Sequence, residues 1–96
     1  MLSRTDFIFT IGYDGPVAVV DGQAKKRYGS LSTSELAKKG LFRAAYSSAL
    51  FSKDSKETAL VIEEYNKMSG TSYKPADSLE RLFGVFLVEV KRAVVL

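Results

Sequence analysis

The sequence predicts an α+β fold, with an N-terminal three-stranded antiparallel β-meander followed by three or four helices packed on one of its faces. Two patterns support this prediction. Asp-Gly occurs twice between β-prone residues near the start of the chain, and cap-like helix starts followed by apolar stripes fill most of the rest. A length of 96 residues suits a single domain over 1–96, with the meander in 1–29 and the helical part in 30–96.

The meander is predicted from alternation and turn chemistry. Large apolar residues occupy every second position over 7–13, which is typical of a strand with one buried face. Strands at 17–20 and 23–28 follow, each preceded by an Asp-Gly turn that begins at Asp14 or Asp21. Because turn geometry explains both aspartates, we do not interpret them as a catalytic or cation-binding pair.

The first helical signal is a capping box, in which the Ser32 side chain and Glu35 satisfy each other's backbone N–H groups. An apolar stripe at helical spacing follows over 41–51. Gly40 either separates two short helices or lies within one longer helix, at a cost of about 1 kcal/mol.

Two further helices are predicted in the second half of the chain. Asp54 begins one of them, and Gly70 provides its stop. Cap-like residues at 77–80 begin the other, whose apolar stripe runs to Val94. A strand over 85–95 is the alternative, because Val is frequent there, but the uninterrupted stripe favours the helix.

Residues 34–50 resemble the helix-turn-helix DNA-binding motif, whose first helix often carries Glu-Leu-Ala and whose turn often contains Gly. The resemblance implies a second helix from which Arg43 and Ser47 project away from the core. The spacing departs from the motif, because Gly40 follows Ala37 by three residues where the motif usually has four. The departure favours two packed helices without a DNA-binding role.

The positive charge of the chain is concentrated between residues 25 and 43. The whole chain has a net charge of +3, whereas this segment alone has +5, since Glu35 is its sole acidic residue. Nucleic acid is therefore one predicted partner, bound through phosphates and a stacked aromatic ring. The candidate residues are Lys25, Lys26, Arg27, Tyr28, Lys38, Lys39 and Arg43. Protection of an exposed edge strand at 23–28 is the competing and favoured interpretation.

The C-terminal segment predicts self-association. Between Gly84 and Val90 only Glu89 is polar, so a helix there needs cover on nearly every side. A second copy of the chain provides such cover, with Phe86, Val90 or Val94 at the interface.

Composition excludes several classes of function. The chain contains no Cys and no His, which removes disulfides, Cys/His zinc sites, thiol nucleophiles and imidazole bases. No metal site, cofactor, catalytic residue or small-molecule substrate is predicted. The N-terminus lacks the pattern of a signal peptide, and no apolar run is long enough to span a bilayer, so we expect a cytoplasmic protein. The sequence favours a small non-catalytic interaction module that acts as a homo-oligomer, with nucleic-acid binding as the alternative.

Overall fold

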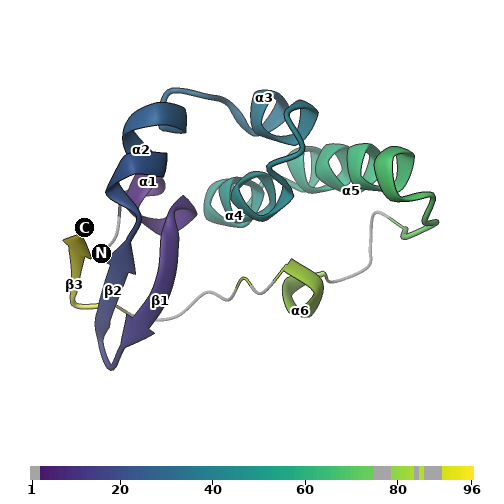
Figure 1. Cartoon of the computed structure of the whole chain (residues 1–96). Helices are drawn as coiled ribbons and strands as arrows, with labels where there is room; N and C mark the ends of the chain where they lie inside the picture. Colours follow the sequence, from purple (N-terminus) through teal and green to yellow (C-terminus); the bar gives the residue numbers. More distant parts are fainter. Residues whose placement is uncertain (1–2, 75–78, 84, 86–89) are drawn as a thin grey trace. The chain divides into compact units, whose positions relative to one another are not determined.

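The computed structural model describes residues 3–74, 79–83, 85 and 90–96 (Figure 1). The α+β class is confirmed. The chain divides into two compact units. The first unit joins Met1–Ser30 to the C-terminal Leu87–Leu96, and the second contains Leu31–Phe86.

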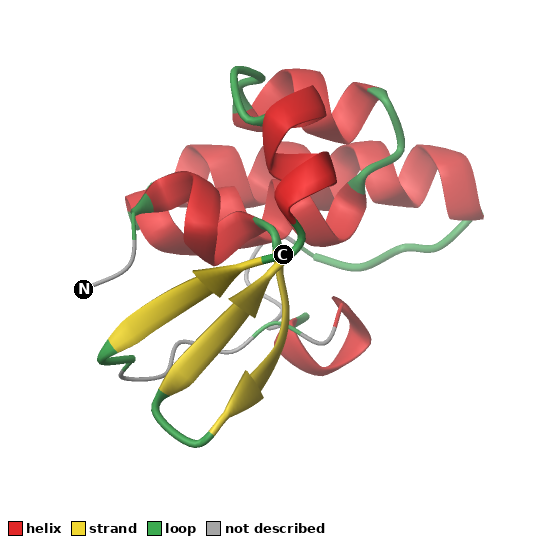
Figure 2. Cartoon of the chain, turned by 60° about the vertical axis from the view of Figure 1, so that its left-hand side comes forward, coloured by secondary structure: helices red, strands yellow, loops and turns green. Residues whose placement is uncertain are grey.

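Within the described residues, three strands of the first unit form one sheet in the order β1-β2-β3 (Figure 2). β1 (Thr10–Asp14) pairs with β2 (Val17–Val20) in antiparallel fashion, which confirms the first predicted hairpin. β3 (Arg92–Val95) pairs with β2 in parallel, so the sheet is mixed and the prediction of an all-antiparallel meander is wrong.

The β1–β2 turn contains two residues, Gly15 and Pro16, and it is closed by the pair Asp14 and Val17. Gly15 has a φ of 58°, a left-handed value that glycine adopts without steric cost. The φ of proline is fixed near −65°, and a positive φ followed by that value is the pattern of a type II′ hairpin turn. Pro16 thus needs no ladder hydrogen bond of its own, and its carbonyl accepts one from the backbone N–H of Lys91 at 2.8 Å.

The strand predicted at 7–13 starts later than the alternation suggests. α1 (Arg4–Ile8) begins at Ser3, whose side chain accepts a hydrogen bond from the backbone N–H of Asp6. The consecutive residues Phe7, Ile8 and Phe9 are all buried, so their burial does not alternate as it would in a strand with one exposed face.

The third meander strand predicted at 23–28 is also wrong, because that segment is the helix α2 (Gly22–Tyr28). Asp21 caps it, and one carboxylate oxygen accepts from the backbone N–H groups of Gln23 and Ala24, both at 3.1 Å. Gln, Ala, Lys and Arg are strong helix formers, and once Asp21 acts as a cap this propensity decides the conformation.

The helix predicted along the C-terminal stripe is much shorter in the structure. α6 (Glu80–Phe83) is helical, and Arg92–Val95 forms a strand instead. The parallel ladder continues past the strand, where the backbone N–H of Leu96 donates to the carbonyl of Val20 at 3.0 Å. β-branched valines suit a pleated strand, and β2 supplies the partner that such a strand needs. The parts of this prediction at 77–78, 84 and 86–89 lie outside the described residues.

The helices of the second unit begin and end close to the predicted signals. Gly40 has a φ of 80° and separates two helices, and the capping box at Ser32 is confirmed, as are the start at Asp54 and the stop at Gly70. The helices are α3 (Thr33–Lys38), α4 (Phe42–Ser52) and α5 (Ser55–Ser69).

The second unit has an aromatic core. Phe83 of α6 packs against Tyr46 of α4 and Tyr65 of α5, with ring centroids 5.1 and 5.2 Å apart. The Tyr46 hydroxyl, which is buried, accepts a hydrogen bond from the backbone N–H of Leu79 at 3.0 Å. Both the apolar ring and the polar end of Tyr46 are therefore satisfied in the core.

Gly22 offers a test of the closure of the first unit. A Cβ at this position would collide with the backbone carbonyl oxygen of Leu96. Helix propensity alone would make Gly22→Ala more stable than the original chain. The collision with the backbone of Leu96 opposes this effect and should lower the free energy of unfolding by about 1–3 kcal/mol. We expect the collision to decide the result of urea unfolding in dilute solution. Gly12→Ala is the matched control, since no neighbouring atom lies within 4 Å of its Cβ position; equal stability of the two variants would contradict the expectation.

Candidate interaction surfaces

The carboxylates of the described residues do not gather into a metal centre. Over that part of the chain, no group of three or more His, Cys, Asp or Glu side chains is placed to hold a metal ion. Asp14 ends β1, and Asp21 caps α2 at the end of β2, so the two Asp-Gly aspartates serve separate local structures. Nor does any helix among the described residues have the length and apolar character needed to cross a membrane.

The structure assigns the seven predicted nucleic-acid-binding residues to different units. Lys25, Lys26, Arg27 and Tyr28 lie on α2 in the first unit, whereas Lys38, Lys39 and Arg43 lie on or beside α3 and α4 in the second. The edge-strand interpretation of the first set is wrong, because α2 is a helix.

Lys25 makes an ion pair within the first unit. Its Nζ lies 2.6 Å from Oδ1 of Asp6, which joins α2 to α1. The two side chains are 34% and 19% exposed, so water screens the pair only in part. Lys25 therefore has a structural partner, and it is the member of the basic run least suited to an external ligand.

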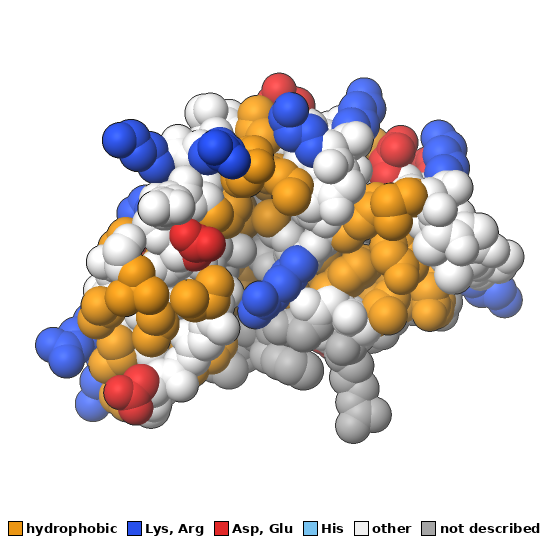
Figure 3. Space-filling model, in the orientation of Figure 1, with side chains coloured by type: hydrophobic (Ala, Val, Ile, Leu, Met, Phe, Trp, Pro, Cys, Tyr) orange, Lys and Arg blue, Asp and Glu red, His pale blue; other side chains and the backbone are white. Residues whose placement is uncertain are grey.

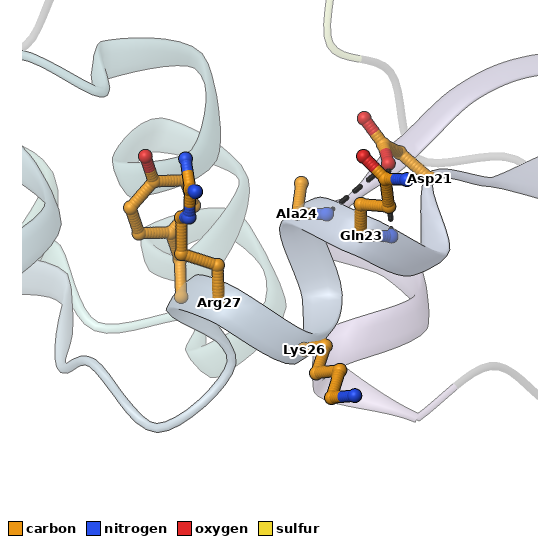
Figure 4. Close-up of a pocket in the computed structure, with 6 residues that line it drawn as sticks. Asp21, Gln23, Ala24, Lys26 and Arg27 are labelled. Atoms are coloured by element: carbon orange, nitrogen blue, oxygen red, sulfur yellow. Dashed lines mark hydrogen bonds between the residues drawn. The ribbon is translucent and has the colours of Figure 1, made fainter.

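Lys26 and Arg27 are exposed, and Tyr28 is half-buried. The guanidinium carbon of Arg27 lies 5.9 Å from the centroid of the Tyr28 ring, within the range of a cation–π interaction. A surface depression of about 530 Å³ runs along the helix (Figure 4). It is lined by Asp21, Gln23, Ala24, Lys26, Arg27 and Tyr28.

The cations of α3 follow an acidic first turn. Lys38 and Lys39 are exposed, as is Arg43 at the start of α4. The backbone hydrogen bond from Ser32 holds the pKa of Glu35 below its ordinary value, and the Ser32 hydroxyl lowers it further. Desolvation opposes these hydrogen bonds, and the charges of Lys39 and Lys38 lower the pKa by lesser amounts. Glu35 therefore remains a carboxylate beside the two lysines and partly offsets their charge.

The helix-turn-helix resemblance does not extend to an exposed reading helix. Residues 45–49 of α4 are consecutively buried, whereas a recognition helix must present side chains to a DNA groove. Ser47, which the resemblance places on the outer face, is 3% exposed, and its hydroxyl donates to the carbonyl of Arg43 at 2.8 Å. The Ser48 hydroxyl is likewise buried against that of Thr33, at 2.6 Å.

The sheet has one buried and one open face. Paired residues of neighbouring strands share a face, and Ala18 and Val20 of β2 are fully buried. The intervening Val17 and Val19 point the other way and are partly exposed, and Val94, paired with Val19, is 42% exposed. Figure 3 shows apolar side chains gathered over the strands on the side that it presents. We call this surface the open sheet face.

Two rows of paired residues cross the open sheet face. One row is Asp14, Val17 and Arg92, and the other is Gly12, Val19 and Val94. The first row thus carries an acidic residue on β1 and a basic residue on β3, both exposed. Neither charge was predicted to belong to an interaction surface, because Arg92 becomes a neighbour of Val17 only through the long-range parallel pairing.

The predicted oligomer-interface residues have different positions. Val94 lies on the open sheet face. Val90 is half-buried and precedes β3, outside any helix or strand. Phe86 lies outside the described residues.

Comparison with known proteins adds no assignment to this geometry, since no protein-family model, curated protein or solved structure matches the chain.

The ion pair between Lys25 and Asp6 can be tested by charge reversal. Lys25→Glu places two carboxylates together and is expected to lower the free energy of unfolding by about 1 kcal/mol. The combined variant Lys25→Glu with Asp6→Lys should recover most of that loss in urea unfolding. Lys26→Glu is the matched control and should have a smaller effect; equal losses for the two single variants would contradict the assignment.

The capping box can be tested through the pKa of Glu35. Ser32→Ala removes the hydroxyl that caps the helix, so the pKa of Glu35 should rise towards its ordinary value of 4.5. The depressed pKa contributes stability above pH 4.5, and that contribution is lost as the pH falls through the folded-state pKa. NMR titration of the Glu35 carboxyl carbon measures the shift, with Ser34→Ala as the control.

Proposed function

We propose that the protein is a small non-catalytic interaction module that acts as a homo-oligomer, with its copies associating through the open sheet face. The observation that carries the proposal is the group of exposed or partly exposed apolar side chains on that face, Val17, Val19 and Val94. Contiguous exposed apolar surface is typical of an interface. The absence of Cys and His from the sequence favours a binding role over a catalytic one.

The charges on the open sheet face favour a second copy as the occupant. Two copies stacked face to face about a two-fold axis parallel to the strands place β1 of each copy over β3 of the other. This rotation leaves every residue at the same position along the strand direction. Asp14 of each copy then lies opposite Arg92 of the other, because both belong to one row of the sheet. The face is thus electrostatically complementary to itself.

The shape of the second row favours the same arrangement. The same two-fold axis places Val94 of each copy over Gly12 of the other. Gly12 has no side chain, and no neighbouring atom lies within 4 Å of its Cβ position. A protruding valine therefore meets a recess, whereas Val17 and Val19 meet their counterparts at the centre.

The size of the face limits the strength of this association. Short strands at ordinary spacings give a face about 14 Å wide and about 13 Å long. A standard interface buries about 800 Å² on each partner, which is considerably more. We therefore expect a weak dimer, with a dissociation constant on the order of 100 μM.

Charge reversal on the first row tests the two-fold arrangement. Asp14→Arg and Arg92→Asp should each weaken self-association by about 10-fold or more, because each places like charges opposite one another. The double variant restores opposite charges and should associate like the original chain. Sedimentation equilibrium over a concentration series measures all three.

Lys91→Asp is the matched control for the charge-reversal series. Lys91 is exposed and adjacent to Arg92, but it lies outside the two rows. It should leave the dissociation constant within about 2-fold. A chain that stays monomeric at about 500 μM, or a double variant no better than the single ones, would overturn the proposal.

A further inference from the structure

We infer that Lys26, Arg27 and Tyr28 of α2, which line one surface depression, form a binding site for single-stranded nucleic acid. We call these three residues the α2 site. The inference goes beyond the proposed self-association and does not depend on it, since it concerns a helix and not the open sheet face.

The helical conformation of residues 23–28 removes the structural role that best explained the basic run. As an edge strand, residues 23–28 would need their positive charges to prevent pairing with other chains. They form a helix, whose backbone hydrogen bonds leave no edge to protect. The remaining structural use is interaction with the negative end of the helix dipole, which a single cation near the C-terminus provides.

Two of the three cations of α2 are exposed and available to an external ligand. Lys25 is engaged by Asp6 at 2.6 Å, which leaves Lys26 and Arg27. Both are exposed, and over the described part of the chain neither has a carboxylate within ion-pair distance. The carboxylate of Asp21 also lines the depression, but it accepts two backbone N–H groups at the start of the helix. Figure 4 shows Lys26 and Arg27 leaving the helix well apart from that carboxylate.

Positive charge and an aromatic ring occur together at the end of α2. Arg27 stands 5.9 Å from the Tyr28 ring, so a guanidinium plane and a phenol ring occur together beside a depression of about 530 Å³. Cations that neutralise phosphates and planar groups on which bases stack are the two components of single-strand binding surfaces.

The structure favours a single strand over a duplex. Sequence reading in a duplex needs an exposed helix or ribbon that enters a groove. α2 has 7 residues, and the central residues of α4 are buried. Bases of a single strand are unpaired, so their faces can reach a ring on the protein surface.

Fluorescence anisotropy with a labelled mixed-sequence single strand at low salt tests the α2 site. We expect a dissociation constant below about 100 μM and a slope of log affinity against log salt of about −1 to −2, since two cations contact phosphates. Lys26→Glu combined with Arg27→Glu should abolish binding. Tyr28→Leu should weaken it by roughly 5- to 150-fold without changing the salt slope, because it removes stacking and no charge.

Lys38→Glu combined with Lys39→Glu is the matched control. These lysines are also adjacent and exposed at the end of a short helix, and the change in net charge is the same. The control should bind within about 3-fold of the original chain, and circular dichroism and urea unfolding of each variant establish that it is folded. An equal loss in the control would overturn the α2 site in favour of diffuse attraction.

Three other outcomes would overturn the inference. One is the absence of binding below about 100 μM, and another is equal affinity for a duplex of the same length. The third is equal binding to polyphosphate or anionic phospholipid vesicles together with no effect of Tyr28→Leu, because those anions have no bases to stack.

Discussion

The parallel pairing of β2 with β3 is the interaction on which the rest of the first unit depends. An isolated two-stranded hairpin is marginal in water, so β1 and β2 need a third strand to form a stable sheet. The chain provides it from its other end, where Arg92 pairs with Val17. A parallel pair requires a long crossover, and here the whole second unit lies in sequence between the paired strands.

This pairing determines features on both sides of the sheet. It makes β2 the central strand, with Ala18 and Val20 fully buried on one face. It brings the carbonyl of Leu96 against the first residue of α2, so position 22 has no room for a side chain. It also places Arg92 in one row with Asp14, which gives the open sheet face its two opposite charges.

Local signals predicted the second unit well and the first unit only in part. Capping boxes, helix stops and the first Asp-Gly turn involve residues within a few positions of one another, so their geometry can be recognised in sequence. Asp21 shows the limit of such reasoning, since Asp before Gly suits a hairpin turn and a helix cap equally. Its role was decided by the strong helix formers that follow it and by β3, which occupies the position beside β2.

The candidate surfaces show the same difference between features that a local sequence signal predicts and features that depend on tertiary structure. Sequence analysis located the exposed cations Lys26 and Arg27, because charge is visible in composition, but it could not show that Asp6 engages Lys25. It also named Val94, though from a helical stripe that the structure replaces with a strand. The row that joins Asp14 to Arg92 follows from tertiary pairing, for which a single sequence contains no local signal.

Self-association and nucleic-acid binding are both proposed for the first unit, and they depend on different physical interactions. Dimerisation nevertheless affects nucleic-acid binding. Self-association buries apolar surface and adds two exposed charge pairs, whereas binding to phosphates depends mainly on counterion release and weakens steeply as salt rises. A dimer formed through the open sheet face carries two copies of α2. A strand long enough to reach both copies binds with greater avidity than a short one, without any new contact. Because such linkage is reciprocal, that strand also stabilises the dimer by the same factor, whereas a strand too short to bridge has no effect on it.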